Sequence, residues 1–298
     1  MPFRTLFHAL RPSFLVLSPV CVFLGASTAY VFSGAIDEMI LLLVVIGALC
    51  AHISVNTLNE YADFRSGLDL ITIRTPFSGG SGALPADPAM ANRVLATGLV
   101  TLFITFAIGL YFVNSHGIPV LALGGIGVVI ILTYSRWINR WPFLCLIAPG
   151  LGFGIIMVTA THYVLAQQTS VTAWLAALVV FFLVNNLLLL NQYPDIEADK
   201  SIGRNHLPIA YGTRFSSFVY GTLSLCAYLV ILAGIYLGHF PTLSLIAVVP
   251  AMFATFSLTG ALKYGNTIGD YHPYLGANVA ATILTPLLLG ISIIVGQH

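Results

Sequence analysis

Long apolar stretches follow one another along almost the whole chain, and short polar segments separate them. A helix needs about 20 mostly apolar residues to cross the hydrocarbon core of a bilayer, where it satisfies its own backbone hydrogen bonds. Nine stretches have a suitable length and composition, so we expect nine membrane-spanning helices. They cover residues 13–33, 39–62, 93–113, 118–134, 143–166, 171–193, 216–237, 242–262 and 275–296.

The composition agrees with this pattern and excludes a soluble protein. Of the 298 residues, 58% are hydrophobic and only 7% are charged, whereas about a quarter of the residues of a soluble domain are charged. The predicted fold class is therefore an all-α polytopic membrane protein, with residues 1–298 forming a single transmembrane domain. The net charge of +1 gives no indication of a nucleic-acid partner.

The charges lie on one side of the predicted bundle. With nine spans, the N-terminus and the loops after spans two, four, six and eight share a side, and all 11 Lys and Arg residues fall in these segments. The positive-inside rule makes this side cytoplasmic. We therefore predict a protein integral to the cell (inner) membrane, with a cytoplasmic N-terminus and an external C-terminus. Most acids share the cytoplasmic side, so the active site is expected there.

A short polar motif occurs twice in the chain. Residues 58–63 (LNEYAD) and 190–195 (LNQYPD) share the pattern L-N-x-Y-x-D, each at the predicted cytoplasmic end of its span. This recurrence suggests two internal pseudo-repeats, residues 13–134 and 143–262, whose motifs face each other. We expect a central cavity between them that opens to the cytoplasmic side.

The spacing of the polar residues in these motifs predicts a metal site. Residues four apart share a helix face, and the helix dipole disfavours carboxylates at helix C-termini, so a positive partner is required. Asp and Asn oxygens suit Mg²⁺, which prefers a few carboxylates together with substrate phosphates. Two facing half-sites therefore suggest that Mg²⁺ bridges a diphosphate. The candidate ligands are Asn59, Glu60, Asp63, Asp69, Asn191, Asp195 and Asp199.

A simpler interpretation is that these acids cap helices and pair with nearby Lys and Arg residues, but two matched clusters favour the metal site. The loop at residues 73–85 (IRTPFSGGSGALP) carries a Ser and Gly run that begins at Ser78. Its backbone N–H groups can form an anion-binding nest or a mobile lid, and Arg74 can reach phosphate oxygens. A flexible linker is the alternative. Arg140 and Arg204 are further cationic candidates, although a lone loop arginine is more often a topology signal.

The segments NEYADFRSGLD and NQYPDIEADKSIGRNHLP resemble the paired motifs of the UbiA superfamily of intramembrane prenyltransferases. The first motif of that family has the form N-D-x-x-D followed by another Asp, and the second is D-x-x-x-D followed by a glycine and a base. Glu60 departs from the usual Asp but keeps the carboxylate. TYSRWINR before the glycine-rich GLGFG looks most like the branch that prenylates 1,4-dihydroxy-2-naphthoate in menaquinone biosynthesis. The resemblance covers nearly the whole chain.

The resemblance implies Mg²⁺-dependent transfer of a polyprenyl group from a polyprenyl diphosphate donor to an aromatic acceptor. The Asn and Asp ligands would hold Mg²⁺ with the help of Glu60, and arginines would neutralise the leaving diphosphate. Tyrosine faces would stabilise the allylic cation, and the isoprenoid tail would lie between helices, open to membrane lipid. The implied catalytic residues are Asp63, Asp195, Arg140 and Arg204, and the implied substrate contacts are Arg74, Tyr61, Tyr134, Tyr193, Ser78 and Lys200.

Other functions fit parts of the same pattern. A related metal site can prenylate 4-hydroxybenzoate or another ring, or cyclise a terpene. A secondary transporter also combines repeats with polar residues inside the membrane, but its binding site lies near the bilayer midplane. Here the charged residues cluster at one interface, which favours chemistry on one side of the membrane.

Overall fold

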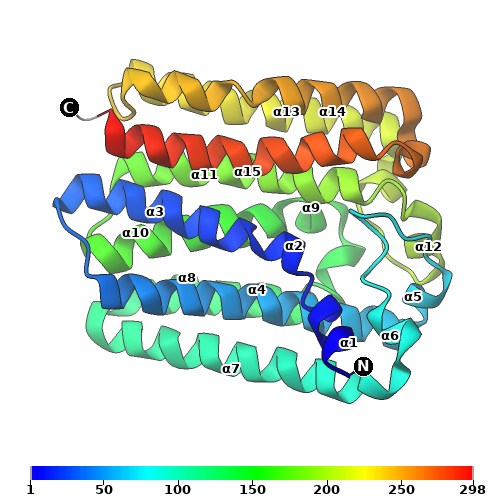
Figure 1. Ribbon diagram of the computed structural model, residues 1–298. Coiled ribbons are helices and arrows are strands. Elements are labelled where there is room, and N and C mark those ends of the chain that lie inside the picture. Colours follow the sequence, from blue (N-terminus) through cyan, green and yellow to red (C-terminus); the bar gives the residue numbers. More distant parts are fainter. Residues whose placement is uncertain (1, 297–298) are drawn as a thin grey trace.

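The computed structural model describes residues 2–296, which form a bundle of helices lying side by side (Figure 1). Eight helical segments are long and apolar enough to cross a membrane. The predicted span at 118–134 is the shorter helix α8 (Ile118–Thr133) of 16 residues. All nine predicted spans are therefore helical, and the prediction of an all-α integral membrane protein is confirmed.

Six of the longer spans consist mainly of one helix: α3 (Leu17–Ser33), α4 (Glu38–Ser66), α7 (Ala91–His116), α11 (Val171–Asn191), α13 (Leu207–Tyr236) and α15 (His272–Val295). The fifth span joins α9 (Pro142–Gly150), the π-helix η3 (Leu151–Val158) and α10 (Thr159–Ala166), and the eighth joins the 3₁₀-helix η4 (Thr242–Val248) to α14 (Ala251–Tyr264). The short connecting helices are α1 (Pro2–Ala9), α2 (Pro12–Leu15), α5 (Leu68–Ile71), α6 (Ala83–Ala86), η1 (Pro88–Met90), η2 (Ile138–Arg140), α12 (Ile196–Ser201) and η5 (Gly265–Asp270).

The irregular fifth span packs closely against α11. Pro149 lies inside α9 and cannot donate a backbone hydrogen bond, and the π-helix begins two residues later. A Cβ on Gly150 would lie 2.4 Å from the carbonyl oxygen of Phe181, and a Cβ on Gly154 would lie 2.4 Å from the nitrogen of the same residue. Glycine at these two positions therefore lets the two backbones approach closely, as small residues do in membrane helix pairs.

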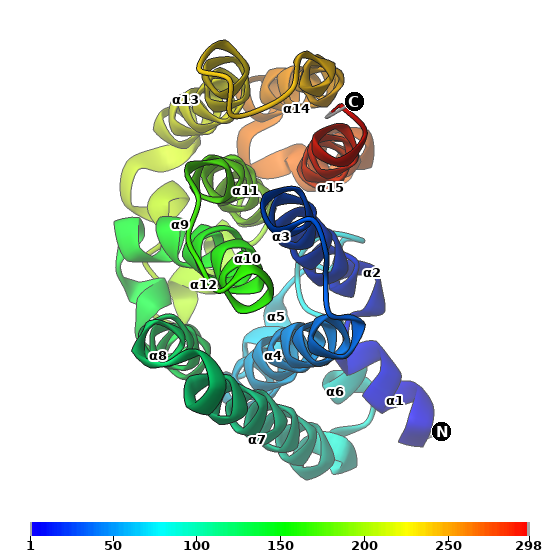
Figure 2. The same cartoon turned by 90° about the vertical axis from the view of Figure 1, so that its left-hand side faces the viewer.

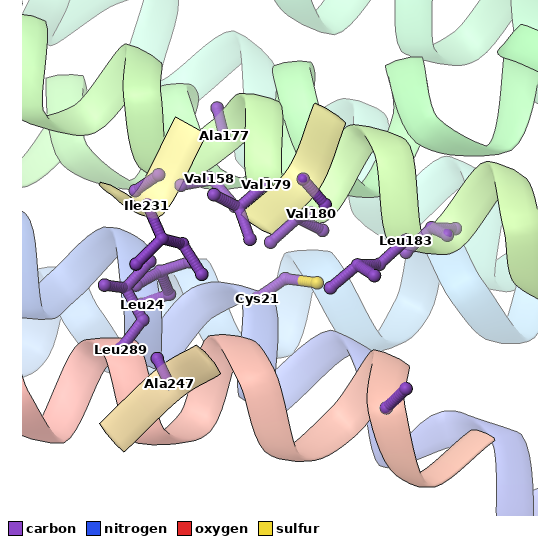
Figure 3. Packing of buried hydrophobic residues seen from close by; sticks show 14 of the residues in the cluster. Cys21, Leu24, Val158, Ala177, Val179, Val180, Leu183, Ile231, Ala247 and Leu289 are labelled. Carbon is purple, nitrogen blue, oxygen red and sulfur yellow. The ribbon is translucent and has the colours of Figure 1, made fainter. Parts of the chain in front are cut away.

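The main hydrophobic core surrounds α11 (Figure 3). Leu24 of α3, Ile231 of α13 and Leu289 of α15 are each fully buried in it. Cys21 lies in the same core as a free thiol and packs there as a small apolar side chain. This packing holds α11 in the middle of the bundle, and the position of the second motif follows from it.

Both motifs lie at the same end of the bundle. The short helices α5, α6 and α12 gather at that end, close to α1, whereas the C-terminus lies at the opposite end (Figure 1). Viewed along the helices, α3, α4, α7, α8 and α10 surround a centre behind which α5 and α12 are visible (Figure 2). Helix α4 extends four residues beyond the predicted end at 62 and stops at Gly67, whose φ of 82° is left-handed. The whole first motif is therefore helical.

Candidate active site

The first motif is fixed by hydrogen bonds on the last turns of α4. The Asn59 side-chain Nδ2 donates to Asp63 Oδ2 at 3.0 Å. The Ser135 hydroxyl, which follows α8, donates to Asn59 Oδ1 at 2.8 Å. Because both ends of the amide are engaged, Asn59 holds the Asp63 carboxylate in one orientation.

The second motif spans the break between α11 and α12. Helix α11 ends at Asn191, and Pro194 follows, so Asp195 lies at the start of α12 and Asp199 lies within it. Asp199 is buried and accepts a hydrogen bond from Arg204 Nη1 at 2.8 Å, and His206 Nε2 lies 3.0 Å from its other oxygen. The spacing of Asn191, Asp195 and Asp199 is that of one helix face, but Pro194 in the sequence already predicts a break nearby, and α11 does end at Asn191.

Arg204 joins the two motifs. Its second terminal nitrogen donates to Asp63 Oδ1, across 141 residues of sequence. One guanidinium therefore lies between Asp63 and Asp199, in the forked geometry that suits arginine. The neighbouring carboxylates raise the pKa of Arg204 above its ordinary value although burial opposes this, so the arginine stays charged.

The segment of residues 72–82, which connects α5 to α6, closes over both motifs. The Gly79 N–H donates to Asp195 Oδ2 at 3.1 Å, and the Ser81 N–H donates to Glu60 Oε2 at 3.2 Å. The Ser81 hydroxyl also donates to Glu60. A Cβ on Gly80 would lie 2.6 Å from Asp69 Oδ1, and the φ of Gly80 is +75°. Glycine is therefore required where this 72–82 segment passes the acids.

A cavity of about 560 Å³ extends from the motifs into the bundle. Its end near the 72–82 segment carries the polar groups of both motifs, and the remainder is lined by apolar residues of α4, α7, α8 and η3. Mostly apolar cavities with a few convergent polar groups are typical ligand sites. Nine of the predicted site residues line this cavity: Asn59, Asp63, Asp69, Ser78, Tyr134, Asn191, Asp195, Asp199 and Arg204.

The oxygen atoms at the polar end fit a hard divalent cation. Asp69 Oδ2, Asn191 Oδ1 and Asp195 Oδ1 are buried and have no hydrogen-bond partner, and such oxygens are ordinary Mg²⁺ ligands. Within residues 2–296, no three His, Cys, Asp or Glu side chains lie close enough to form a complete metal site. A partial set suits Mg²⁺, because this ion commonly takes substrate phosphates and water as its remaining ligands.

Two of these carboxyl groups have altered acidity. Burial, and next the Glu60 and Asp63 carboxylates, raise the pKa of Asp69 to about 7. Burial, and next the Asp199 carboxylate, raise the pKa of Asp195 to about 7. Burial and then neighbouring negative charge disfavour the ionised form of both groups, so a bound cation would stabilise the ionised forms.

Six predicted residues do not line the main cavity. Glu60 is fully buried, and Arg11 Nη2 and the 72–82 segment occupy its oxygens. Arg74 is exposed and donates to the Asp69 carbonyl oxygen at 2.9 Å. Tyr193 points into the core, where its hydroxyl donates to the Thr213 carbonyl oxygen at 3.1 Å. Lys200 is exposed, while Tyr61 and Arg140 line a separate, smaller cavity.

These differences have a common physical reason. The sequence shows which residues lie near a helix end, but the rotation of that end decides which side chains face inward. In α4, Asn59 and Asp63 face the cavity, so Glu60 and Tyr61, one and two residues on from Asn59, point elsewhere. Glu60, Tyr61, Arg74, Tyr193, Lys200 and Arg140 therefore do not line the main cavity, and their contacts with metal or substrate stay predictions.

Other residues of the site were not predicted from the sequence. Arg11 forms a 3.0 Å ion pair with Glu60 and lines the main cavity, yet in the sequence it resembles a topology signal. Ser135 lies within the TYSRWINR segment but was not itself a candidate site residue. His52 lines the cavity deeper in the bundle and lies 2.8 Å from the Ser18 hydroxyl. The sequence does indicate an inward-facing position for His52, because it lies one turn before Asn56 and two before Asn59 on the same polar stripe, although it was not among the candidate site residues.

The fold and the site define a helical intramembrane protein whose cavity has one end with unpaired carboxyl and amide oxygens and an otherwise apolar lining. The chain matches the UbiA prenyltransferase family over residues 16–267. It therefore belongs to that family, and the predicted resemblance is confirmed.

Relatives and solved structures agree with this assignment. The chain is 28% identical over 212 residues to the 1,4-dihydroxy-2-naphthoate octaprenyltransferase of Bacillus subtilis; the match covers 70% of this chain and 66% of that protein. A UbiA homologue from Archaeoglobus fulgidus bound to GPP and Mg²⁺ has the same fold, with a TM-score of 0.65, 14% identity and coverage of 97% and 99% of the two chains. A digeranylgeranylglyceryl phosphate synthase has a TM-score of 0.67 at 16% identity, covering 98% and 99%.

Proposed function

We propose that this protein transfers a polyprenyl group from a polyprenyl diphosphate to an aromatic acceptor in a Mg²⁺-dependent reaction. The observation that carries the proposal is the cavity itself, in which unpaired acid and amide oxygens from two motifs meet an apolar interior. A diphosphate needs the first environment and a prenyl chain needs the second. The Archaeoglobus homologue bound to GPP and Mg²⁺ supports both ligands.

The oxygens of Asn59, Asp63, Asn191, Asp195 and Asp199, with Asp69, would hold Mg²⁺. When bound, the metal supplies positive charge that stabilises the departing diphosphate. Arg204 adds a permanent positive charge at the same place, because its guanidinium already lies between the two motifs. These residues therefore bind and orient the diphosphate end of the donor.

The reaction then exchanges one bond for another. The bond between the allylic carbon and the diphosphate oxygen breaks, and the diphosphate keeps the electron pair. An aromatic ring carbon donates an electron pair to the allylic cation, and the ring regains aromaticity by losing a proton or its carboxyl group. Tyr134 lines the cavity next to the motifs, where its ring face can stabilise the cation. The 72–82 segment excludes water, which would otherwise capture the cation.

The acceptor that we propose is 1,4-dihydroxy-2-naphthoate, which the name of the Bacillus relative supports. Loss of menaquinone from the lipid quinones of a deletion strain, measured by mass spectrometry, is the expected result. An unchanged quinone pool would reject this acceptor. We also propose that the motif end of the bundle faces the cytoplasm, because the basic residues favour that orientation.

The catalytic proposal is tested with purified protein in lipid nanodiscs. Geranylgeranyl diphosphate, dihydroxynaphthoate and Mg²⁺ are expected to give a prenylated naphthalene product and inorganic diphosphate. Asp195→Asn should abolish turnover, since it removes charge from an unpaired ligand oxygen, whereas the exposed Glu197→Gln on the same short helix should not. Full activity of Asp195→Asn would refute the assigned metal site.

A further inference from the structure

A second, smaller cavity lies on the other side of the ion pair between Asp63 and Arg204. Its volume is about 370 Å³. Asp63, Asn139 and Arg204 line both this cavity and the main one, so these three residues form a shared wall.

The second cavity concentrates positive charge. Four of the chain's 11 Lys and Arg residues line it, namely Arg65, Arg136, Arg140 and Arg204. Asp63 is the one acid in the lining, and it is already paired with Arg204. Among the described residues, the side chains of Arg65, Arg136 and Arg140 have no hydrogen-bond or ion-pair partner. The cluster therefore lacks the negative charge that would balance it.

This convergence requires three separate parts of the fold. Arg65 lies in the last turn of α4, Arg136 and Arg140 lie in the connection from α8 to α9, and Arg204 follows α12. The positive-inside rule explains why each segment carries an arginine on one side of the membrane. It does not explain why they surround one cavity. Arg204 also has a buried, unpaired Nε atom, which leaves donor capacity beyond its two carboxylate partners.

The proposed reaction releases inorganic diphosphate, which needs a polar route out of the main cavity. A released diphosphate cannot leave through the apolar part of the main cavity, because a multiply charged anion is costly in lipid. The 72–82 segment covers the polar end through its hydrogen bonds to Asp195 and Glu60. The shared wall, formed by Arg204, Asp63 and Asn139, is therefore the polar way out that remains while the segment is closed.

We propose that the second cavity is a binding site for a phosphate-type anion and that it receives the inorganic diphosphate as it leaves the main cavity. Arg204 passes the anion from one cavity to the other, because its guanidinium borders both. Arg65, Arg136 and Arg140 hold the anion before it enters the cytoplasm. This inference rests on the proposed function, and a phospholipid headgroup is the other source of the same phosphate chemistry.

The test combines a binding measurement with kinetics in nanodiscs. The variant is Arg65→Gln/Arg136→Gln/Arg140→Gln. The matched control is Arg93→Gln/Arg214→Gln/Lys263→Gln, which removes three exposed positive charges that line neither cavity. With the main cavity saturated by the unreactive analogue farnesyl thiodiphosphate, calorimetry measures the binding of added inorganic diphosphate.

The wild type and the control should still bind diphosphate beside the analogue, and the variant should not. The single-turnover rate of the variant should equal that of the wild type, while its steady-state rate should fall about tenfold because product release becomes limiting. Absence of diphosphate binding beside the analogue in the wild type, or unchanged binding in the variant, overturns the proposal.

A lipid comparison separates the two sources of the anion. Activity is compared in nanodiscs of phosphatidylglycerol and of phosphatidylcholine. If the variant differs from the wild type only in losing a higher activity in phosphatidylglycerol, and its diphosphate binding is unchanged, the site holds a lipid headgroup and the release role is wrong. Failure of the proposed function has a different signature, because the wild type would then form no product in a single turnover. The diphosphate binding measurement would still report on the second cavity.

Discussion

Glu60 provides the sharpest test of how the site closes. Its carboxylate is fully buried and engages Arg11 Nη2 at 3.0 Å together with the N–H and hydroxyl of Ser81. We expect Glu60→Gln to loosen the 72–82 segment, because the neutral amide weakens all three interactions. As a metal ligand, by contrast, Glu60 would mainly set the concentration of Mg²⁺ that the enzyme needs.

The size of the effect follows from the contacts. Hydrogen bonds to a charged acceptor contribute about 1.5–3 kcal/mol each, against about 0.5–1.5 kcal/mol for neutral ones. Arg11 remains 24% exposed, so the loss of its ion pair is discounted for solvent screening. Only the two Ser81 interactions hold the 72–82 segment, so the substitution should cost about 2–3 kcal/mol of segment closure. Every 1.4 kcal/mol shifts the ratio of closed to open segment about tenfold.

Two measurements report the opening directly. Arg74 lies in the segment and is exposed, so trypsin cleavage after Arg74, mapped by mass spectrometry, should accelerate by at least about 30-fold if it tracks the open fraction. Water should also capture more of the allylic cation, raising the share of prenyl alcohol over prenylated acceptor. Glu197→Gln, an exposed acid on α12, is the matched control and should change neither value.

One pattern of results would contradict an anchoring role of Glu60 for the 72–82 segment. If Glu60→Gln raises the Mg²⁺ concentration for half-maximal activity while tryptic cleavage and the alcohol share stay at wild-type values, Glu60 acts on the metal and does not anchor the segment.

Three further predictions concern the motifs and the apolar part of the cavity. Burial raises the pKa values of Asp69 and Asp195 to about 7 in the folded protein. Without metal, these two carboxyl groups therefore keep protons at pH values where the same groups of the unfolded chain have lost them. The melting temperature without metal should therefore fall as the pH rises from about 4 to 7, and stabilisation by Mg²⁺ should grow over the same range; a Mg²⁺ effect independent of pH would contradict this. Arg204→Gln leaves two buried carboxylates without their cation, so its melting temperature should fall, with partial rescue by saturating Mg²⁺; no rescue would argue against metal at this position. Gly125 lines the cavity, and a Cβ on it meets no atom within 4 Å, so the Gly125→Leu variant should fold normally. The added side chain should lower the rate with geranylgeranyl diphosphate more than the rate with geranyl diphosphate. Equal effects on both donors would show that the prenyl chain does not reach Gly125.

The membrane architecture follows from the sequence alone, and the sequence also predicts the kind of ligand. Lipid offers no partners for backbone N–H and C=O groups, so a long apolar stretch has to become helical, and all nine predicted stretches are helical in the described residues 2–296. Asn59, Asp63, Asn191 and Asp195 carry hard oxygen ligands at the ends of those helices whatever the packing, so oxygen coordination of a cation could be predicted from residue type and spacing.

Which of the polar residues contact one another depends on how the helices pack. The Arg11 partner of Glu60 is 49 residues away, and the Asp63 partner of Arg204 is 141 residues away. Tyr193 was a candidate for the cavity, but the rotation of its segment turns the hydroxyl toward Thr213 and Ser217. The local pattern of a membrane helix fixes its length and depth, whereas its rotation and neighbours depend on packing with small residues such as Gly150 and Gly154. The closing segment and the second cavity arise from such long-range packing, which no single stretch of the sequence encodes.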